Sequence, residues 1–347
     1  MSGPAKGSSL IHEIDATHFA SLQGGIDAFL DVLEGPTRIK IPGEDNSRCR
    51  IFITLLHGNE PSGMTALLQL LQERLVPVVD VHCYLIATEA ANTMPRFSCR
   101  QVPGKRDYNR CFKPPYDIDD QGPVCRQLQE DIIALSPEAV VDMHNTSGEG
   151  PAFGVITRYD RRHDNLVSLF TDRVIVTDLR LGAIMETSTE NIPVVTIECG
   201  GAFESAADRL AYTGLKRYFS TLDLYALAET EFPIDKYEHP LRVELSTGSS
   251  LSFGEFPIAD ADVTLKTEIE HHNFGEVTRD TLLGWVKTDA LHKIRAYDSG
   301  RNDHFKNLYR VENGELYPRE NQKLFMITSD PVIAKSDCLW YVTRSKN

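Results

Sequence analysis

Three stretches of this 347-residue chain share one pattern, in which an apolar run leads into a residue able to bind a metal or a proton and then into a glycine-containing loop. They read LLHGNEPSG, VVDMHNTSGEG and VVTIECGG. Such apolar runs predict buried strands, and ligands of open α/β sheets bind beyond the carboxyl ends of the strands. We therefore expect His57, Glu60, His144 and Glu198 to converge at one edge of a sheet.

The first stretch contains an H-x-x-E pair, whose spacing of three lets His57 and Glu60 reach one point at the turn from a strand into a helix. By itself such a pair is also typical of a structural histidine and of a glutamate that favours a helix start. With His144 the set becomes His, Glu, His, which is the ligand composition of a catalytic zinc site with its fourth position open to water. The pattern predicts a single bound zinc ion.

Two carboxylates could support this site. Asp142 lies two residues before His144 and faces the same side of its strand, where it could accept the second ring N–H of that histidine or merely cap a turn. Glu198 ends an apolar strand, which is a costly position for a carboxylate without a partner or a function. Zinc-assisted hydrolysis needs a general base, and Glu198 is our candidate for it.

A basic loop at residues 100–110 contains Gly and Pro in an otherwise acidic protein. Arg presents a fork that matches a carboxylate, so such a loop above a sheet edge would suit anion recognition. A solvated surface loop with scattered ion pairs explains the same residues. Composition alone favours the surface loop.

The elements that position these residues follow from the hydrophobic pattern. From Arg50 to about Tyr225, short β-branched runs alternate with segments of helical period, which is typical of an α/β unit with a largely parallel sheet. The pattern predicts strands at 51–56, 78–87, 139–143 and 193–197, and helices at 63–71, 121–135 and 205–228.

The hydrophobic pattern of the sequence changes after Pro233. Short strand-like pieces punctuated by Gly, Pro and Asn follow, namely LRVELSTGSSLSF, DVTLKTEIE, TLLGWVKT and KLFMITSDPVI. These pieces predict a smaller, mostly β unit. We therefore expect a catalytic domain over residues 1–232 and a β-rich C-terminal domain over residues 233–347.

Four motifs together resemble a known family. They are HGNEPSG at 57–63, RDYNR at 106–110, DMHNTSGEG at 142–150 and IECGG at 197–201. In this order and spacing they resemble the succinylglutamate desuccinylase and aspartoacylase family, a branch of the zinc carboxypeptidase superfamily. The resemblance implies an α/β fold of zinc-carboxypeptidase type, with a mostly parallel or mixed sheet flanked by helices and a smaller C-terminal β-rich domain.

The resemblance also implies roles for individual residues. His57, Glu60 and His144 would be the zinc ligands, and Glu198 the catalytic carboxylate. The sequence Asp107-Tyr108-Asn109-Arg110 matches the family's Asp-x-Asn-Arg element, so Asp107, Asn109 and Arg110 would form the binding site for the substrate's carboxylate. The family has a further Arg upstream that stabilises the oxyanion. We assign this role to Arg100, with Arg106 as the alternative.

The chain departs from aspartoacylases in the part that selects the substrate. Residues 181–197 contain no Arg or Lys, whereas aspartoacylases carry an Arg a few residues before the catalytic Glu that holds the acidic side chain of their substrate. The late Tyr that closes the aspartoacylase pocket has no clear counterpart, because Tyr317 and Tyr341 align poorly. The resemblance therefore establishes neither acetylaspartate nor succinylglutamate as the substrate.

Composition limits the partners and the location. The chain has 36 Lys and Arg against 50 Asp and Glu, and its net charge of −14 excludes a nucleic-acid binder driven by bulk charge. No apolar stretch suits a secretory signal or a membrane span, and the seven cysteines form no CxxC pair. We expect a soluble, cytoplasmic protein with reduced thiols and no membrane partner.

These inferences combine into one functional prediction. The protein would be a zinc-dependent amidohydrolase that removes the acyl group from a small, carboxylate-bearing N-acyl amino acid. Two alternatives remain: a metallocarboxypeptidase acting on peptide C-termini, and a non-catalytic relative that binds a carboxylated metabolite. The oligomeric state stays open, a homo-oligomer included.

Overall fold

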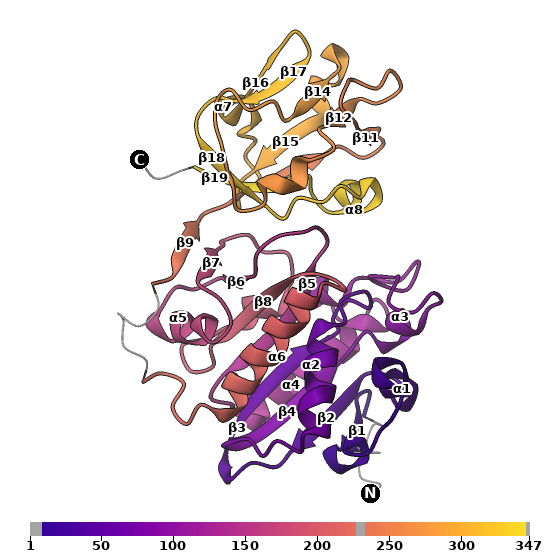
Figure 1. The fold of residues 1–347 in the computed structure, drawn as a ribbon, viewed down its shortest axis with the longest axis vertical. Helices are drawn as coiled ribbons and strands as arrows, with labels where there is room; N and C mark the ends of the chain where they lie inside the picture. The colour runs from indigo at the N-terminus through magenta and orange to yellow at the C-terminus, as the bar shows by residue number, and fades with distance from the viewer. Residues whose placement is uncertain (1–8, 227–232, 345–347) are drawn as a thin grey trace, which may run out of the picture.

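A computed structural model of the protein describes residues 9–226 and 233–344. Within these residues the N-terminal part is built on a nine-stranded sheet, and the C-terminal part on two five-stranded sheets that lie beyond one end of it (Figure 1). None of the helices in the described ranges is both long and apolar enough to span a bilayer. All seven cysteines are free, as predicted.

The large sheet is mixed and mostly parallel, which confirms the predicted fold class. Its strands are β1 (His12–Asp15), β2 (Thr37–Ile41), β3 (Asp45–Thr54), β4 (Val79–Leu85), β5 (Val140–Thr146), β6 (Phe153–Ile156), β7 (Arg173–Val176), β8 (Val194–Gly201) and β9 (Asp235–Glu238). They lie in the order β1-β2-β4-β3-β5-β8-β6-β7-β9. Adjacent strands are parallel except in the pairs β2–β4 and β6–β8.

Helices cover both faces of this sheet. They are α1 (Gly25–Val32), α2 (Ser62–Gln72), α3 (Thr88–Asn92), α4 (Gln121–Leu135), α5 (Arg161–Ser168) and α6 (Ser205–Ser220). Successive residues of a strand point to opposite faces. Phe52 of β3 therefore packs into the core that contains apolar residues of α2 and α6, whereas Ile51 and Ile53 pack into the core that contains Leu128 of α4.

The helix predicted at 205–228 is shorter than expected, because α6 ends at Ser220. The buried guanidinium of Arg50 donates hydrogen bonds to the carbonyl oxygens of Tyr218 and Thr221, and Thr221 adopts an extended backbone. These carbonyls are satisfied by a side chain, so the chain can leave the helix there. The last two residues of the predicted helix, 227 and 228, lie outside the described residues.

The regular elements of the C-terminal part are mostly short strands, as predicted. They are β10 (Leu241–Leu245), β11 (Leu251–Phe253), β12 (Val263–Leu265), β13 (Glu276–Val277), β14 (Gly284–Val286), β15 (Ile294–Tyr297), β16 (Tyr309–Glu312), β17 (Glu315–Pro318), β18 (Gln322–Phe325) and β19 (Trp340–Arg344). One sheet has the order β13-β18-β19-β10-β15 and the other β11-β12-β14-β17-β16. The two-domain division at residue 232 stays a proposal; the strand that follows it, β9, pairs with β7 in the large sheet.

Two segments that we expected to be strand-like are helical instead. Ile269–His272 forms a short 3₁₀ helix, η4, and Pro331–Ser336 forms α8. The carboxylate of Asp330 accepts hydrogen bonds from the backbone N–H groups of Val332 and Ile333, and Pro331 occupies the first turn. This combination starts a helix, and it outweighs the strand preference of the β-branched residues that follow.

Candidate active site

The ends of three neighbouring strands form the site. β3, β5 and β8 are adjacent in the sheet, and His144 of β5 lies directly opposite Glu198 of β8. His57 and Glu60 follow β3 in the turn that leads into α2. The structure brings these four side chains together, so the predicted convergence at one sheet edge is confirmed.

The turn after β3 requires close backbone approaches. Leu55 has a positive φ of 56°, which is uncommon for a bulky residue. A Cβ atom on Gly58 would lie 2.5 Å from the backbone nitrogen of Ala91, and one on Gly63 would lie 2.2 Å from Oγ1 of Thr54. Glycine at both positions lets the turn and the start of α2 pack against their neighbours, which places His57 and Glu60 at the sheet edge.

Two histidines and a glutamate converge at the centre of the site. The Nδ1 atoms of His57 and His144 lie 3.1 Å apart. Oε1 of Glu60 lies 2.9 Å from Nδ1 of His57, and Oε2 lies 2.6 Å from Nδ1 of His144. All three side chains are buried.

A second carboxylate lies behind each histidine. Nε2 of His57 is 3.0 Å from Oδ1 of Asp107, and Nε2 of His144 is 2.8 Å from Oδ2 of Asp142. The second contact is the one predicted for Asp142. When each Nε2–H donates to its carboxylate, both Nδ1 atoms present lone pairs beside the Glu60 carboxylate, and only a cation or protons can satisfy such a set. The donors therefore fit zinc, and no other group of the described residues offers a comparable set.

The electrostatics of the site also favour positive charge. Burial raises the pKa of Glu60, but the two imidazoles outweigh it and hold that pKa well below its usual range, so the carboxylate is ionised. Burial lowers the pKa of His144, yet Asp142 and Glu60 outweigh it and raise that pKa well above its ordinary value. The carboxylates thus stabilise positive charge at this point, and a divalent cation could supply that charge in place of protons.

Glu198 lies on β8, the strand next to β5, and faces the same cavity as His57 and Glu60. Burial raises the pKa of its carboxyl to about 7; the Glu60 carboxylate adds to this effect, and His144 opposes it. A carboxyl group that titrates near neutral pH can both accept and donate a proton. This is the property that a general base requires when it must later act as an acid.

The structure separates the two candidate arginines of the basic loop. Nε and Nη2 of Arg100 donate to Oδ2 of Asp107 at 3.2 and 3.0 Å, and its Nη1 lies 3.5 Å from Oε1 of Glu60. Arg100 lines the cavity at the site. Arg106 instead pairs with Asp119 and borders a different, smaller hollow. Arg100 is therefore the arginine placed next to the candidate metal ligands.

The Asp-x-Asn-Arg element lies beside the site but divides into two parts. Asn109 and Arg110 line the cavity. Oδ1 of Asn109 accepts a hydrogen bond from the backbone of Ile184 at 3.1 Å, and Nη1 of Arg110 donates to the carbonyl of Asn109 at 2.8 Å. Asp107 does not line the cavity, because its carboxylate is turned toward His57 and Arg100. Its contacts position those two side chains rather than contact a ligand.

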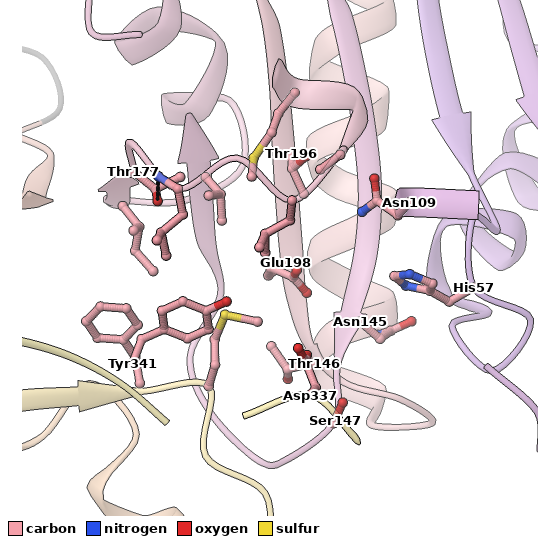
Figure 2. A pocket seen from close by; sticks show the side chains of 18 of the residues that line it. His57, Asn109, Asn145, Thr146, Ser147, Thr177, Thr196, Glu198, Asp337 and Tyr341 are labelled. Atoms are coloured by element: carbon pink, nitrogen blue, oxygen red, sulfur yellow. Dashed lines mark hydrogen bonds between the residues drawn. The ribbon is translucent and has the colours of Figure 1, made fainter. Parts of the chain in front are cut away.

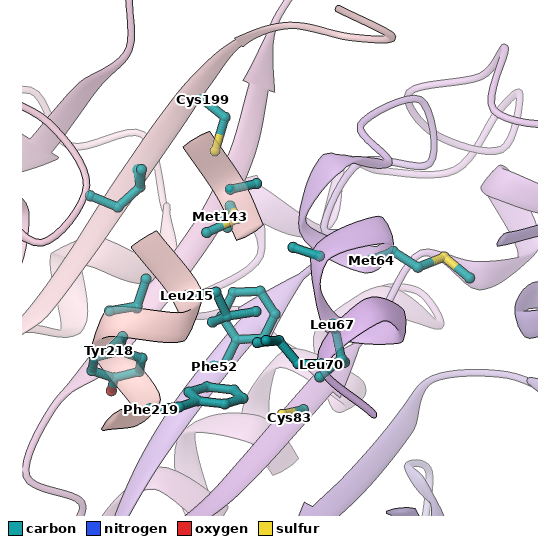
Figure 3. Packing of buried hydrophobic residues seen from close by; sticks show 14 of the residues in the cluster. Phe52, Met64, Leu67, Leu70, Cys83, Met143, Cys199, Leu215, Tyr218 and Phe219 are labelled. Carbon is teal, nitrogen blue, oxygen red and sulfur yellow. The ribbon is translucent and has the colours of Figure 1, made fainter. Parts of the chain in front are cut away.

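A cavity of about 100 Å³ lies at the centre of the site, and its lining includes His57, Glu60, Arg100, Asn109, Arg110 and Glu198. In Figure 2, Glu198 lies at its middle, with His57 and Asn109 on one side and Tyr341 on the other. Cys199, the next residue along β8, points to the opposite face of the sheet, where it packs near Met143 in the core (Figure 3). Cys199 therefore takes no part in the site, as its position on the strand predicts.

Asn145 is a site residue to which the sequence analysis gave no role. Its Nδ2 donates to Oγ of Ser62 at 2.9 Å and to the carbonyl of Gly200 at 3.1 Å, and its backbone N–H donates to Oε2 of Glu60. Asn145 thus connects the end of β5 to the segment after β3 and to the end of β8. The sequence signal that could have identified Asn145 as a site residue is its position directly after His144.

Asp337 was also missed, and it comes from the C-terminal part of the chain. Its Oδ1 accepts a hydrogen bond from Nη2 of Arg242 at 2.6 Å and lies 3.7 Å from Nη2 of Arg110. Burial raises the pKa of Asp337, but Arg110 and Arg242 outweigh it and lower that pKa. No local pattern marks this residue, because its position depends on how the two parts of the molecule meet.

Comparison with known proteins supports the fold rather than a sequence relationship. No protein-family model and no curated protein sequence matches the chain. Solved structures do match it. A succinylglutamate desuccinylase/aspartoacylase from Rhodobacter sphaeroides is similar with a TM-score of 0.56 and 14% identity, over 88% of each chain.

Two further structures have the same fold. The succinylglutamate desuccinylase of Vibrio cholerae gives a TM-score of 0.56 with 12% identity, over 93% of this chain and 95% of that one. Murine aminoacylase 3 gives a TM-score of 0.54 with 13% identity, over 87% of this chain and 96% of that one. The chain therefore has the fold of the succinylglutamate desuccinylase/aspartoacylase structures, which is the fold that its four motifs predicted.

Proposed function

We propose that this protein is a zinc-dependent amidohydrolase that removes the acyl group from a small N-acyl amino acid with a free carboxylate. One observation carries the proposal: the lone-pair atoms of His57, Glu60 and His144 converge beside Glu198, in a cavity that also contains Arg100 and Arg110. Ligands for a metal, a base and two cations are the groups that hydrolysis of such an amide needs.

His57, Glu60 and His144 would hold the zinc. When bound, zinc would supply Lewis-acid polarisation and a nucleophilic water at neutral pH. Asp107 and Asp142 support this role, because each accepts the outer ring N–H of one histidine and so holds the ring with Nδ1 toward the centre. These contacts fix the tautomer and the orientation of both rings before any metal binds.

Glu198 would move the proton. It accepts a proton from the attacking water and returns it to the nitrogen of the departing amine, so that the carboxyl group ends each cycle as it began. Arg100 is held by Asp107 with its guanidinium at the cavity, where it would stabilise the negative charge that develops on the carbonyl oxygen. Asn109 and Arg110 would bind the carboxylate of the substrate.

The similar structures support the same class of reaction. Their names describe a succinylglutamate desuccinylase, an aspartoacylase and an aminoacylase, each of which acts on an acylated amino acid. At identities of 12 to 14% these names give the reaction class as a proposal for this chain and leave the substrate open.

A hydrolysis screen tests the proposal. The zinc-loaded protein is incubated with N-acetyl, N-succinyl and N-formyl amino acids and with short unmodified peptides, and the released amine is quantified. We expect release from at least one class of acyl amino acid and none from peptides. Cleavage of peptides together with failure on every acyl amino acid would establish the carboxypeptidase alternative, and tight binding without any cleavage would establish the non-catalytic one.

A further inference from the structure

The cavity at the active site has one wall that is mostly apolar and contains no charged side chain. The N-terminal part contributes Ile175 of β7, Leu179, and Met185 of the short helix η3 (Ile184–Thr187) to this wall. The C-terminal part contributes Phe325 of β18 and Tyr341 of β19. These five side chains belong to one packed apolar cluster. The rings of Phe325 and Tyr341 are stacked with their planes only 3° apart. We refer to these five residues as the apolar wall.

Charged groups elsewhere in the lining allow one ligand carboxylate but not two. Within the described lining, Arg100 and Arg110 are the sole Arg or Lys side chains. Arg100 donates two hydrogen bonds to the Asp107 carboxylate and is assigned to the oxyanion. Arg110, whose Nη2 lies at the longer distance of 3.7 Å from Oδ1 of Asp337, is left for the substrate. The lining also contains three acidic side chains, Glu60, Glu198 and Asp337.

A second carboxylate on the substrate would therefore lack a partner. Against the apolar wall it would lose its hydration without gaining a counter-charge, and the hydroxyl of Tyr341 is the one hydrogen-bond donor among these five side chains. Near Glu198 or Asp337 it would meet another acidic group. Arg180, which is close in sequence to the wall, does not provide the missing cation, because its side chain is exposed and does not line the cavity. An uncharged group would instead gain from burial against these side chains.

We infer that the substrate carries one carboxylate, bound by Asn109 and Arg110, and one apolar group, which occupies the space against the apolar wall. This inference rests on the proposed function and names its substrate class: N-acyl derivatives whose amino-acid side chain or acyl chain is apolar. N-acyl derivatives of aspartate or glutamate and N-succinyl compounds are excluded as preferred substrates.

Two substrate series test the inference and separate the two possible sources of the apolar group. The first varies the side chain with a constant acyl group: N-acetyl-leucine, N-acetyl-methionine and N-acetyl-phenylalanine against N-acetyl-aspartate and N-acetyl-glutamate. The second varies the acyl group on glycine: N-hexanoyl against N-succinyl. In at least one series the wild-type protein should prefer the apolar member in kcat/KM by about 100-fold or more. Preference for the acidic member in both series would overturn the inference while leaving the proposed function intact.

A charge introduced into the wall gives a sharper test. Met185→Arg supplies the missing cation, and we expect it to reduce the preference for the apolar substrate by at least about tenfold. The matched control is Met94→Arg, because Met94 is 78% exposed and does not line the cavity. An unchanged preference in Met185→Arg, with the fold intact by circular dichroism, would contradict the role of the wall.

Equilibrium binding separates failure of this inference from failure of the proposed function. Glu198→Gln keeps the wall and the carboxylate site but removes the proposed base. By titration calorimetry it should bind N-acetyl-leucine more tightly than N-acetyl-aspartate, even in the case that the wild type hydrolyses neither. Tighter binding of N-acetyl-aspartate would overturn the inference whether or not hydrolysis occurs.

Discussion

The smallest unit of the site is a histidine held between two carboxylates. Each of the two rings has one nitrogen against an outer aspartate and the other against Glu60. This arrangement explains why both Nδ1 atoms point inward although His57 lies in the turn after β3 and His144 lies in β5. It also explains how the aspartates would support a metal ion that they do not touch.

Asp142→Asn tests this positioning role. The substitution removes the charge behind His144 but keeps the size of the side chain, so the imidazole becomes less basic and its tautomer less fixed. We expect zinc affinity to fall by about 10-fold to 100-fold, measured by competition with a chelator. Asp172→Asn, at an exposed position that does not line the cavity, is the control. Equal zinc affinity in wild type and Asp142→Asn would contradict the role.

The pH dependence of the rate reports on Glu198. The pKa of this carboxyl is raised to about 7, mainly by burial. A base must be deprotonated, so kcat should fall as the pH falls through this pKa, by about tenfold per pH unit. A bound divalent cation favours the ionised form, which places this limb at or below about pH 7. Zinc content measured at each pH controls for loss of the metal. A rate that increases between pH 7 and pH 5 would contradict Glu198 as the base.

At the residue scale, local motifs predicted most of the site. His57, Glu60, His144 and Glu198 could be placed because each lies close to the carboxyl end of an apolar strand, and these strand ends meet at a sheet edge. Asp107 was predicted to bind the substrate together with Asn109 and Arg110, and in the structure its carboxylate contacts His57 and does not line the cavity. Motif position alone cannot tell a residue that faces the cavity from its neighbour that faces the protein, because the difference lies in the turn geometry of the loop.

At the scale of elements, Arg50 of β3 connects the sheet to the end of α6. Its side chain is fully buried, and its guanidinium donates to the carbonyls of Tyr218 and Thr221 and to the carboxylate of Glu138. Arg50→Met should reduce the free energy of unfolding by about 2 to 4 kcal/mol, because these carbonyls lose their partner. Urea denaturation followed by circular dichroism measures the change.

Arg48 offers a matched control on the same strand. It also pairs with Glu138, but its side chain is 38% exposed, so water can replace its contacts. Arg48→Met should cost less than about 1 kcal/mol. Equal losses in the two variants would show that the buried contacts to α6 are not what makes Arg50 stabilising.

Element types followed from the sequence more closely than element ends. The helix predicted at 121–135 matches α4 at both ends, whereas the one predicted at 205–228 extends beyond α6. Apolar periodicity continues past Ser220, but the carbonyls there bind a side chain from a distant strand. Such long-range contacts are invisible to periodicity. The miss at α8 has a different, local cause, because a short capping sequence starts this helix among strand-like residues.

At the scale of the whole molecule, the C-terminal part completes the cavity. Phe325, Asp337 and Tyr341 line it, and the backbone loops of the two parts touch. A Cβ atom on Gly148 would lie 2.2 Å from the carbonyl oxygen of Ile327. This close approach explains why the first glycine of the DMHNTSGEG motif, Gly148, has no side chain. A substrate must therefore fit between two parts of the chain, which favours small molecules over polypeptides.

Asn273 holds this junction together. Its Nδ2 donates to the carbonyls of Glu149 at 2.7 Å and Ile327 at 3.0 Å, and its Oδ1 accepts from the N–H of Ile327 at 2.8 Å. Asn273→Ala should raise KM by several-fold, because the loops that form the cavity lose a shared anchor, while zinc content stays at the wild-type level. Steady-state kinetics and metal analysis measure both.

The exposed Asn321, whose side chain bonds to Glu276, provides the control for this prediction. Asn321→Ala should leave KM unchanged. A loss of zinc in Asn273→Ala would instead mean that the junction supports the metal site directly.

Glu198 is the proposed base of a zinc-dependent amide hydrolysis, and the variant Glu198→Gln tests this role. The measurement is turnover of the preferred N-acyl amino acid together with the zinc content of the same sample, with His144→Ala as the variant that should lose the metal. We predict that Glu198→Gln retains zinc at the wild-type level and loses activity by about 10³-fold or more. Full activity in zinc-loaded Glu198→Gln would contradict the mechanism.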